Sequence, residues 1–185
     1  GAGSFRICTV VHLQLKTGDH TNFTFLNTHI DDQSDAQRRL AASVILYRAR
    51  FEAVTTNNPV LVAGDFNSPP TGADSGAYNI FNTGVTPPVA INATFAAKYA
   101  VAPQSPAFSM LDLRAEAPRR VVKSTFATFT GFTAPSLTSS WQRIDFLFGG
   151  TNGGWTADGY RVESSRTDDG VLASDHRPVF ADVTL

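Results

Sequence analysis

The sequence contains very little cysteine, lysine or glutamate. Cys8 is the only cysteine among 185 residues, so a disulfide within the chain is excluded, and a small apolar residue in a strand is the expected role of its thiol. Lysine occurs only three times, and the net charge of −1 provides no broad positive field for nucleic acid. The apolar runs are too short to cross a bilayer, so no membrane span is expected.

What is present fits one globular domain with a substantial core, because 42% of the residues are hydrophobic and only 17% are charged. Two tripeptides, Asn22-Phe23-Thr24 and Asn92-Ala93-Thr94, match the glycosylation acceptor pattern. Together with the scarcity of lysine, they lead us to expect an extracellular protein.

Hydropathy patterns predict a mixed α/β domain in which strands dominate the core. A helix is expected after Ser34, because Ser34 and Gln37 form a capping-box pattern. We expect its arginines to form a solvated face. The apolar face of this helix is predicted from residues spaced three and four apart, namely Leu40, Val44, Tyr47, Phe51 and Val54.

Six strands are predicted, the first two as an antiparallel hairpin, at residues 9–15, 22–29, 59–63, 143–148, 160–164 and 179–185. Short helices are expected at residues 77–81 and 93–101. Residues 124–132 are ambiguous, with a strand running into a turn at Gly131 as one interpretation.

Two strand ends in the first half of the chain carry polar residues that could act on a phosphate. His29 can donate a proton or bind a phosphate oxygen, although for this segment taken alone a histidine satisfied in a turn is the more ordinary role. Asp65 and Asn67 follow the strand at 59–63 and offer a carboxylate and an amide to a cation, a water or a phosphate. An Asx-turn is the structural alternative for this pair.

Two further segments lie near the end of the chain. Asp145 is a charge within an apolar strand, where it needs a partner, either a histidine that it orients or a cation such as Arg143. Asp175 and His176 are adjacent, so their side chains diverge, and one can bind a metal while the other acts as a base. His176 with Asp145 would form a pair of general base and orienting carboxylate that activates water.

Taken in order, these segments resemble the endonuclease/exonuclease/phosphatase family, whose members include DNase I-like nucleases. That family shows Thr-His, then Gly-Asp-Phe-Asn, then Ile-Asp-aromatic, then Ser-Asp-His, and the sequence has all four, with residues 124–132 also in the expected place. The resemblance implies an α/β (α+β) fold, part of a four-layer α/β/β/α sandwich with two packed mixed or antiparallel sheets.

The resemblance also implies a role for each residue. His176 would be the general base, oriented by Asp145, and Asp175 would be a Mg²⁺ ligand. Asp65 and Asn67 would position water, metal and phosphate, so that Asp65 is also a candidate ligand. His29 would bind the phosphate or assist the leaving group. Mg²⁺ is the expected cofactor, with Mn²⁺ or Ca²⁺ as alternatives, and the cation would offset negative charge as water attacks phosphorus.

The sequence departs from the family pattern before His29, where members carry an Asn and a metal-binding Glu. Its glutamates, Glu52, Glu116 and Glu163, all fall later. We therefore expect residues 1–185 to form a single domain of this family that lacks its N-terminal part, with a second chain as one source of the missing half.

The predicted function is hydrolysis of phosphate esters, with a phosphodiesterase or nuclease as the first expectation and nucleic acid as one candidate substrate. Alternatives are a phosphomonoesterase acting on a small phosphoester, and a non-catalytic binding module or inactive fragment that kept the fold. A serine or cysteine hydrolase has little support, because no Gly-x-Ser-x-Gly elbow occurs and Cys8 has no activating neighbours in the sequence.

Overall fold

The computed structural model describes residues 5–82, 86–122, 125–133 and 139–185. Two hydrogen-bonded sheets and a group of helices make up this part of the chain. The elements are β1 (Cys8–Gln14), β2 (Asn22–His29), α1 (Asp35–Thr56), β3 (Val60–Asp65), α2 (Gly76–Phe81), α3 (Ala93–Lys98), β4 (Met110–Asp112), α4 (Leu113–Glu116), β5 (Arg119–Val122), β6 (Asp145–Gly150), β7 (Thr156–Val162) and β8 (Val179–Thr184).

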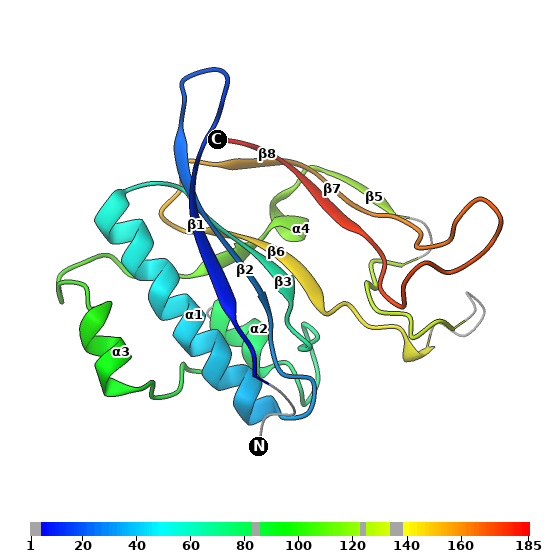
Figure 1. Ribbon diagram of the computed structural model, residues 1–185, viewed down its shortest axis with the longest axis horizontal. Coiled ribbons are helices and arrows are strands. Elements are labelled where there is room, and N and C mark those ends of the chain that lie inside the picture. The colour runs from blue at the N-terminus through cyan, green and yellow to red at the C-terminus, as the bar shows by residue number, and fades with distance from the viewer. Residues whose placement is uncertain (1–4, 83–85, 123–124, 134–138) are drawn as a thin grey trace.

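The larger sheet has the strand order β1-β2-β3-β6-β4, and the smaller sheet has the order β5-β7-β8. β1 and β2 form the predicted antiparallel hairpin, β2 and β3 are parallel, and β3 and β6 are antiparallel. Figure 1 shows α1, α2 and α3 on one side of the larger sheet, and the smaller sheet on the other side. The described residues therefore form a helix layer and two packed mixed sheets, as the resemblance implied.

Two hydrophobic cores hold these layers together. Between the helices and the larger sheet, the ring of Phe66 meets three others edge to face, with centroids 4.8 Å from Phe81, 5.9 Å from Phe146 and 5.3 Å from Phe148. All four rings are fully buried. The second core lies between the two sheets around Leu113 and residues of β7 and β8. No helix in the described ranges is long and apolar enough to cross a membrane.

Helix α1 begins where the capping pattern placed it. Ser34 adopts an extended backbone and its hydroxyl accepts a hydrogen bond from the Gln37 N–H. The reciprocal bond comes from Asp31 rather than Gln37, because the Asp31 carboxylate accepts from the N–H groups of Gln33 and Ser34 at 3.0 and 2.7 Å. The buried Asp31 thereby fixes the turn that leads from β2 into the helix.

The predicted apolar face of α1 does not face the sheet. Leu40 and Val54 are 36% and 38% exposed, and a different set of mostly small residues is buried, namely Ala42, Ile45, Leu46, Ala49 and Ala53. The helix carries two apolar stripes, and the predicted stripe in part contacts the segment around α3. There the Tyr47 hydroxyl donates to the Ala96 carbonyl at 3.0 Å, and the rings of Phe51 and Tyr99 lie 5.2 Å apart.

The arginines of α1 also differ from the prediction of a solvated face. Arg38 is buried and binds the Asp74 carboxylate at 2.5 Å. Arg48 donates to the buried Glu52 at 2.7 Å, and Arg50 donates to the Ser105 carbonyl at 3.1 Å. Arg38 and Arg50 thus join the helix to loops that pass over it, whereas the Arg48–Glu52 bond lies within the helix. Each guanidinium has several donors to satisfy when it leaves water.

Sequence patterns located the longer elements and missed the short ones. β1, β2, β3, β6, β7, β8, α2 and α3 lie within a few residues of their predicted ranges. β4, α4 and β5 were not predicted. In residues 125–133, the structure shows an irregular loop with isolated bridges at Phe129 instead of a strand, while residues 123 and 124 lie outside the described part.

Candidate active site

Three adjacent strands of the larger sheet bring three of the predicted site residues side by side. β2 ends at His29 and β3 ends at Asp65, and these two residues are partners in the parallel register. Asp145 begins β6 and is the partner of Asp65 in the antiparallel register. Partner residues on neighbouring strands point to the same face of a sheet, so the three side chains project together from one sheet end.

Gly64 permits the close approach of β2 and β3 next to this site. A Cβ atom added at Gly64 would lie 2.0 Å from the Thr28 carbonyl oxygen, and its φ of +155° disfavours any larger residue. The glycine therefore sets the spacing of the two strands just before His29 and Asp65.

His176 joins the cluster from the loop before β8. Its Nδ1 lies 2.8 Å from an Asp145 carboxylate oxygen, and its Nε2 lies 3.8 Å from Asp65 Oδ2. The predicted pair of His176 and Asp145 is thus formed, with Nε2 turned toward Asp65. Arg143, the alternative partner of Asp145, instead pairs with the buried Asp112.

The electrostatics of the pair follow from its neighbours. Burial on its own would lower the pKa of His176, but the hydrogen bond and charge of Asp145, followed by the charges of Asp65 and Asp175, outweigh it and raise that pKa. Burial and then the charge of Asp145 raise the pKa of Asp65, against the opposing effects of the Asn67 N–H and the two histidines. Asp65 is therefore held in a position that disfavours its own negative charge.

Asn67 and His29 complete the side of the site next to β2. The Asn67 N–H donates to Asp65 Oδ1 at 2.8 Å, as in the Asx-turn considered from the sequence. Its side-chain amide donates to the Ile30 carbonyl at 3.2 Å and lies 3.2 Å from His29 Nε2. That His29 nitrogen is 3.3 Å from Asp65 Oδ2, and the His29 side chain is 58% exposed, so a ligand can reach it from solvent.

Asp175 stands apart from the tight cluster. The side chains whose ligand atoms all lie within 4.8 Å of one another, among the described residues, are Asp65, Asp145 and His176. The Asp175 carbonyl oxygen accepts bonds from the Thr130 N–H at 2.7 Å and the Thr130 hydroxyl at 3.0 Å. Its carboxylate is near enough to raise the pKa of His176. The metal-binding role of Asp175 stays a prediction.

The loop at 125–133 supports the site, and sequence reasoning assigned no role to its individual residues. The buried Thr128 hydroxyl accepts from the N–H groups of both Ile144 and Asp145, each at 3.0 Å. The Phe129 ring packs on the His176 imidazole with centroids 5.1 Å apart. This loop therefore fixes both members of the His176–Asp145 pair. In the sequence, the signal for this loop was that residues 124–132 stand where the family pattern expects them.

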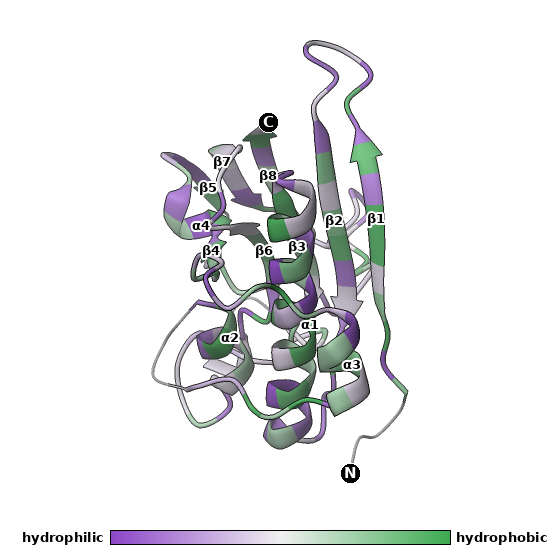
Figure 2. Cartoon of the chain, turned by 90° about the vertical axis from the view of Figure 1, so that its left-hand side faces the viewer, coloured by the Kyte–Doolittle hydropathy of each residue, from purple (hydrophilic) through white to green (hydrophobic). Residues whose placement is uncertain are grey.

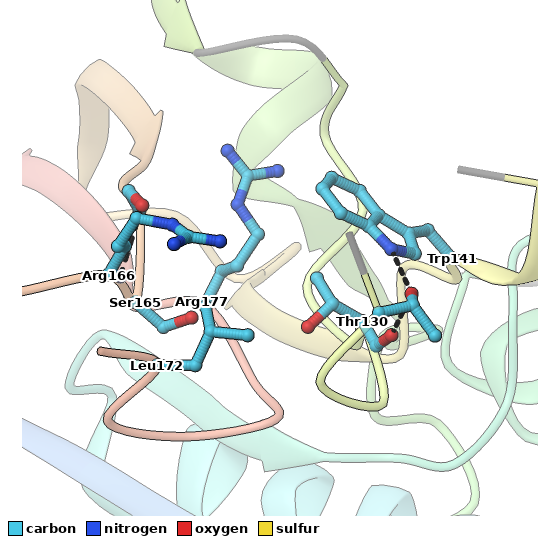
Figure 3. Close-up of a pocket in the computed structure, with 8 residues that line it drawn as sticks. Thr130, Trp141, Ser165, Arg166, Leu172 and Arg177 are labelled. Carbon is cyan, nitrogen blue, oxygen red and sulfur yellow. Dashed lines mark hydrogen bonds between the residues drawn. The ribbon is translucent and has the colours of Figure 1, made fainter. Parts of the chain in front are cut away.

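Arg177 anchors the same loop from the other side. Its guanidinium donates to the carbonyl oxygens of Thr125, Ala127 and Glu163 at 2.7, 2.9 and 3.1 Å. Figure 3 shows this side chain between Arg166 and Trp141 beside a crevice of about 40 Å³. The crevice is too small for more than about one or two waters, so we assign it a packing role.

The donor set of the cluster fits a divalent cation. Two carboxylates and an imidazole within mutual reach are groups that bind Mg²⁺ or Mn²⁺, with oxygen preferred by Mg²⁺. A bound cation would stabilise the ionised form of Asp65, which burial and the charge of Asp145 disfavour. None of the glutamates is in this cluster. Glu52, for example, is buried and pairs with His12 at 2.7 Å.

Comparison with known proteins yields fold relatives and no close sequence relative. No protein-family model and no curated protein matches the sequence. An endonuclease/exonuclease/phosphatase from Bacteroides vulgatus matches 100% of the chain with a TM-score of 0.72 and 24% identity. A mannosyl-6-phosphatase from Bacteroides thetaiotaomicron matches 97% with a TM-score of 0.66 and 22% identity. TDP2 from D. rerio, in complex with a single-strand DNA product, matches 96% with a TM-score of 0.54 and 15% identity.

The chain has the fold of endonuclease/exonuclease/phosphatase proteins. It spans 57% of the length of the two Bacteroides structures and 62% of the TDP2 chain. The predicted fold class, a DNase I-like arrangement of two packed sheets, is confirmed.

Proposed function

We propose that the protein is a Mg²⁺-dependent hydrolase of phosphate esters. The single observation that carries this proposal is the His176 imidazole, held by Asp145 through Nδ1 and presenting Nε2 toward Asp65. A histidine that is oriented on one nitrogen and free on the other is the arrangement of a general base. The fold shared with phosphatases and nucleases supports phosphorus as the electrophile.

In the proposed mechanism, His176 Nε2 takes a proton from water as the water oxygen attacks phosphorus. Asp145 accepts the Nδ1–H bond and stabilises the imidazolium that results. His29, exposed beside Asp65, donates a proton to the departing alkoxide oxygen as the P–O bond breaks, and the Asn67 amide orients the phosphate. A divalent cation held by Asp65, with Asp175 as its predicted second ligand, would supply Lewis-acid stabilisation of the phosphate oxygens. Asp145 and His176, although within reach of the same cation, would act in this mechanism as orienting carboxylate and base.

Two substrate classes follow from different observations. A phosphodiester of nucleic acid is the first candidate, because TDP2 with its DNA product has the same fold. A small phosphomonoester is the second, because the net charge of −1 argues against tight binding to long nucleic acid and the mannosyl-6-phosphatase also has this fold. A binding module without activity is the remaining alternative, and the assembled His176–Asp145 pair speaks against it.

The test is turnover of bis-p-nitrophenyl phosphate, p-nitrophenyl phosphate and single-stranded DNA with and without Mg²⁺. We expect Mg²⁺-dependent hydrolysis of at least one of them, lost in His176→Ala and Asp175→Ala and retained in His20→Ala, whose side chain lies in the exposed hairpin turn. Turnover that survives His176→Ala would refute the mechanism. No turnover of any phosphoester by the protein and its natural partners would favour the binding module.

We also propose an extracellular location. Asn22 and Asn92, the two acceptor asparagines, are both exposed. Intact mass measurement of the protein from its natural source should show added hexosamine at one or both sites, and an unmodified mass would leave the proposal without support.

A further inference from the structure

The buried ion pair between Arg143 and Asp112 has no part in the mechanism described above. The Arg143 side chain is 9% exposed and the Asp112 side chain 3%, so both charges have been removed from water. Such a pair gives little net stability, because the cost of dehydrating the two charges offsets most of their attraction. Arg143 also cannot reach a substrate while Asp112 holds its guanidinium. What the pair does provide is a fixed point for the segment of chain on which Arg143 lies.

Asp112 is held by three elements of the fold. It ends β4, where it lies opposite Phe148 of β6, and Figure 2 shows α4 directly after it, next to β6. Its Oδ1 accepts a hydrogen bond from the Arg114 N–H of α4 at 3.0 Å. Its Oδ2 accepts a hydrogen bond from the Tyr78 hydroxyl of α2 at 3.1 Å. The Asp112 carboxylate is therefore a rigid anchor for Arg143.

Arg143 lies in the short segment that leads into β6. The register between β3 and β6 begins at Asp145, so Arg143 stands just outside the sheet. Its guanidinium carbon lies 4.5 Å from the centre of the Phe146 ring, so the side chain passes Asp145 on its way to Asp112. The Thr128 hydroxyl holds the N–H groups of the two residues that follow Arg143. Asp112 and Thr128 together fix the chain before and at Asp145.

We propose that Arg143 is a positioning residue, whose bond to Asp112 fixes the chain entering β6 so that the Asp145 carboxylate stays aimed at His176 Nδ1. This inference rests on the proposed function, in which His176 is the general base. A displacement of about 1 Å at a catalytic group can slow an enzyme about a hundredfold, and the bond between Asp145 and His176 is only 2.8 Å long. Arg143 acts through Asp145 and does not touch the substrate.

The first test is Arg143→Gln in the protein produced from its natural gene, assayed with whichever of the three phosphoesters it hydrolyses. We expect kcat to fall at least tenfold and KM to change less than twofold, because no group that binds the substrate is altered. The matched control is Arg48→Gln, which removes the arginine from the buried Glu52 within α1. The control should lose unfolding free energy but keep kcat within twofold of the parent. An equal loss of kcat in both variants would reflect stability alone and overturn the proposal.

Asp112→Asn tests the same bond from its other end. We expect a loss of kcat like that of Arg143→Gln. The double variant should be no more than twofold slower than the slower single variant, because both changes break one bond. Losses that multiply in the double variant would mean that Arg143 acts independently of Asp112, and the proposal would be wrong.

A spectroscopic readout separates this inference from the proposed function. In metal-free protein with ¹⁵N-labelled histidine, the Nδ1–H of His176 should exchange slowly with water because Asp145 accepts its hydrogen bond, and His176→Ala identifies its signal. We expect this exchange to be at least tenfold faster in Arg143→Gln and unchanged in Arg48→Gln. If that result appears in a protein that hydrolyses no phosphoester, the positioning role stands and the proposed function fails. Unchanged exchange in Arg143→Gln, or hydrolysis at the parent rate, would reject the positioning role alone.

Discussion

Asp65 and Asp145 lie directly opposite each other on the antiparallel strands β3 and β6. Like charges at opposed positions destabilise a sheet. Burial, and then the charge of Asp145, raise the pKa of Asp65. A cation bound between two carboxylates that face each other in this way would offset their repulsion.

The first prediction is that Asp65→Asn stabilises the metal-free protein while abolishing activity. Folding raises the pKa of this carboxyl, so its ionised form destabilises the folded state. The variant should therefore gain stability near neutral pH, by up to about 1 kcal/mol. The gain should begin to fall as the pH drops through the raised pKa of Asp65 in the folded state, and it should vanish below the ordinary pKa of 3.8, where the carboxyl is protonated in both states. Urea unfolding at several pH values measures both effects.

Mg²⁺ provides the control for this prediction. The cation should raise the unfolding temperature of the parent by mass action and have little effect on Asp65→Asn. An equal shift in both proteins would place the bound cation elsewhere.

The second prediction concerns the pH dependence of hydrolysis. The general base must be neutral, and Asp145 raises the pKa of His176 above the ordinary value of 6.5, so the ascending limb of kcat/KM should lie above that pH. Asp145→Asn removes the charge that favours the imidazolium. The limb should then move to lower pH, with a rate loss of about 10²–10⁴-fold. A limb that does not move would mean that another group titrates.

The third prediction tests the support given by Thr128. Thr128→Val keeps the shape but leaves the buried N–H groups of Ile144 and Asp145 without their acceptor, which should cost about 1–3 kcal/mol of unfolding free energy. Activity should fall as well, because the hydrogen bond to Thr128 holds the backbone of Asp145 in place. Thr128→Ser restores the hydroxyl and should recover most of both. Failure of serine to recover activity would mean that the methyl group matters more than the acceptor.

The fourth prediction compares two glycines with positive φ. Gly64→Ala brings a Cβ against the Thr28 carbonyl, so we expect a loss of about 2 kcal/mol or more in unfolding free energy and lower activity through displaced strand ends. Gly18→Ala meets nothing within 4 Å and should cost about 1 kcal/mol, without loss of activity. Equal losses of unfolding free energy in the two variants would mean that the strained backbone conformation, and not the contact with Thr28, causes the loss at Gly64.

The sequence singled out residues that the structure brings together, because these polar residues interrupt or end apolar strands. Asp145 within an apolar run needed a partner, and His176 was the partner expected and found. The bonds that hold this pair could not be foreseen, because the Thr128 hydroxyl reaches Asp145 across an irregular loop with no periodic signal. Arg143 paired with Asp112, a residue on a strand too short to be recognised.

The faces of α1 illustrate a different limit. Spacing identified an apolar stripe that includes Tyr47 and Phe51, yet a second stripe of small residues packs on the sheet. Which stripe faces the sheet depends on the depth of the space between layers, and small side chains such as Ala42 and Ala49 allow the close approach. Periodicity alone contains no information about that depth.

Asp65 and Asp145 are neighbours in the sheet, yet α2, α3, β4, α4 and β5 lie between them along the chain. By contrast, β1, β2, α1 and β3 form a local unit that can assemble early, because its contacts are short in sequence. The His176–Asp145 pair can form only after β6 and the loop before β8 are in place. We therefore expect activity to appear in the last kinetic phase of refolding, so that recovery of hydrolysis reports completion of the fold.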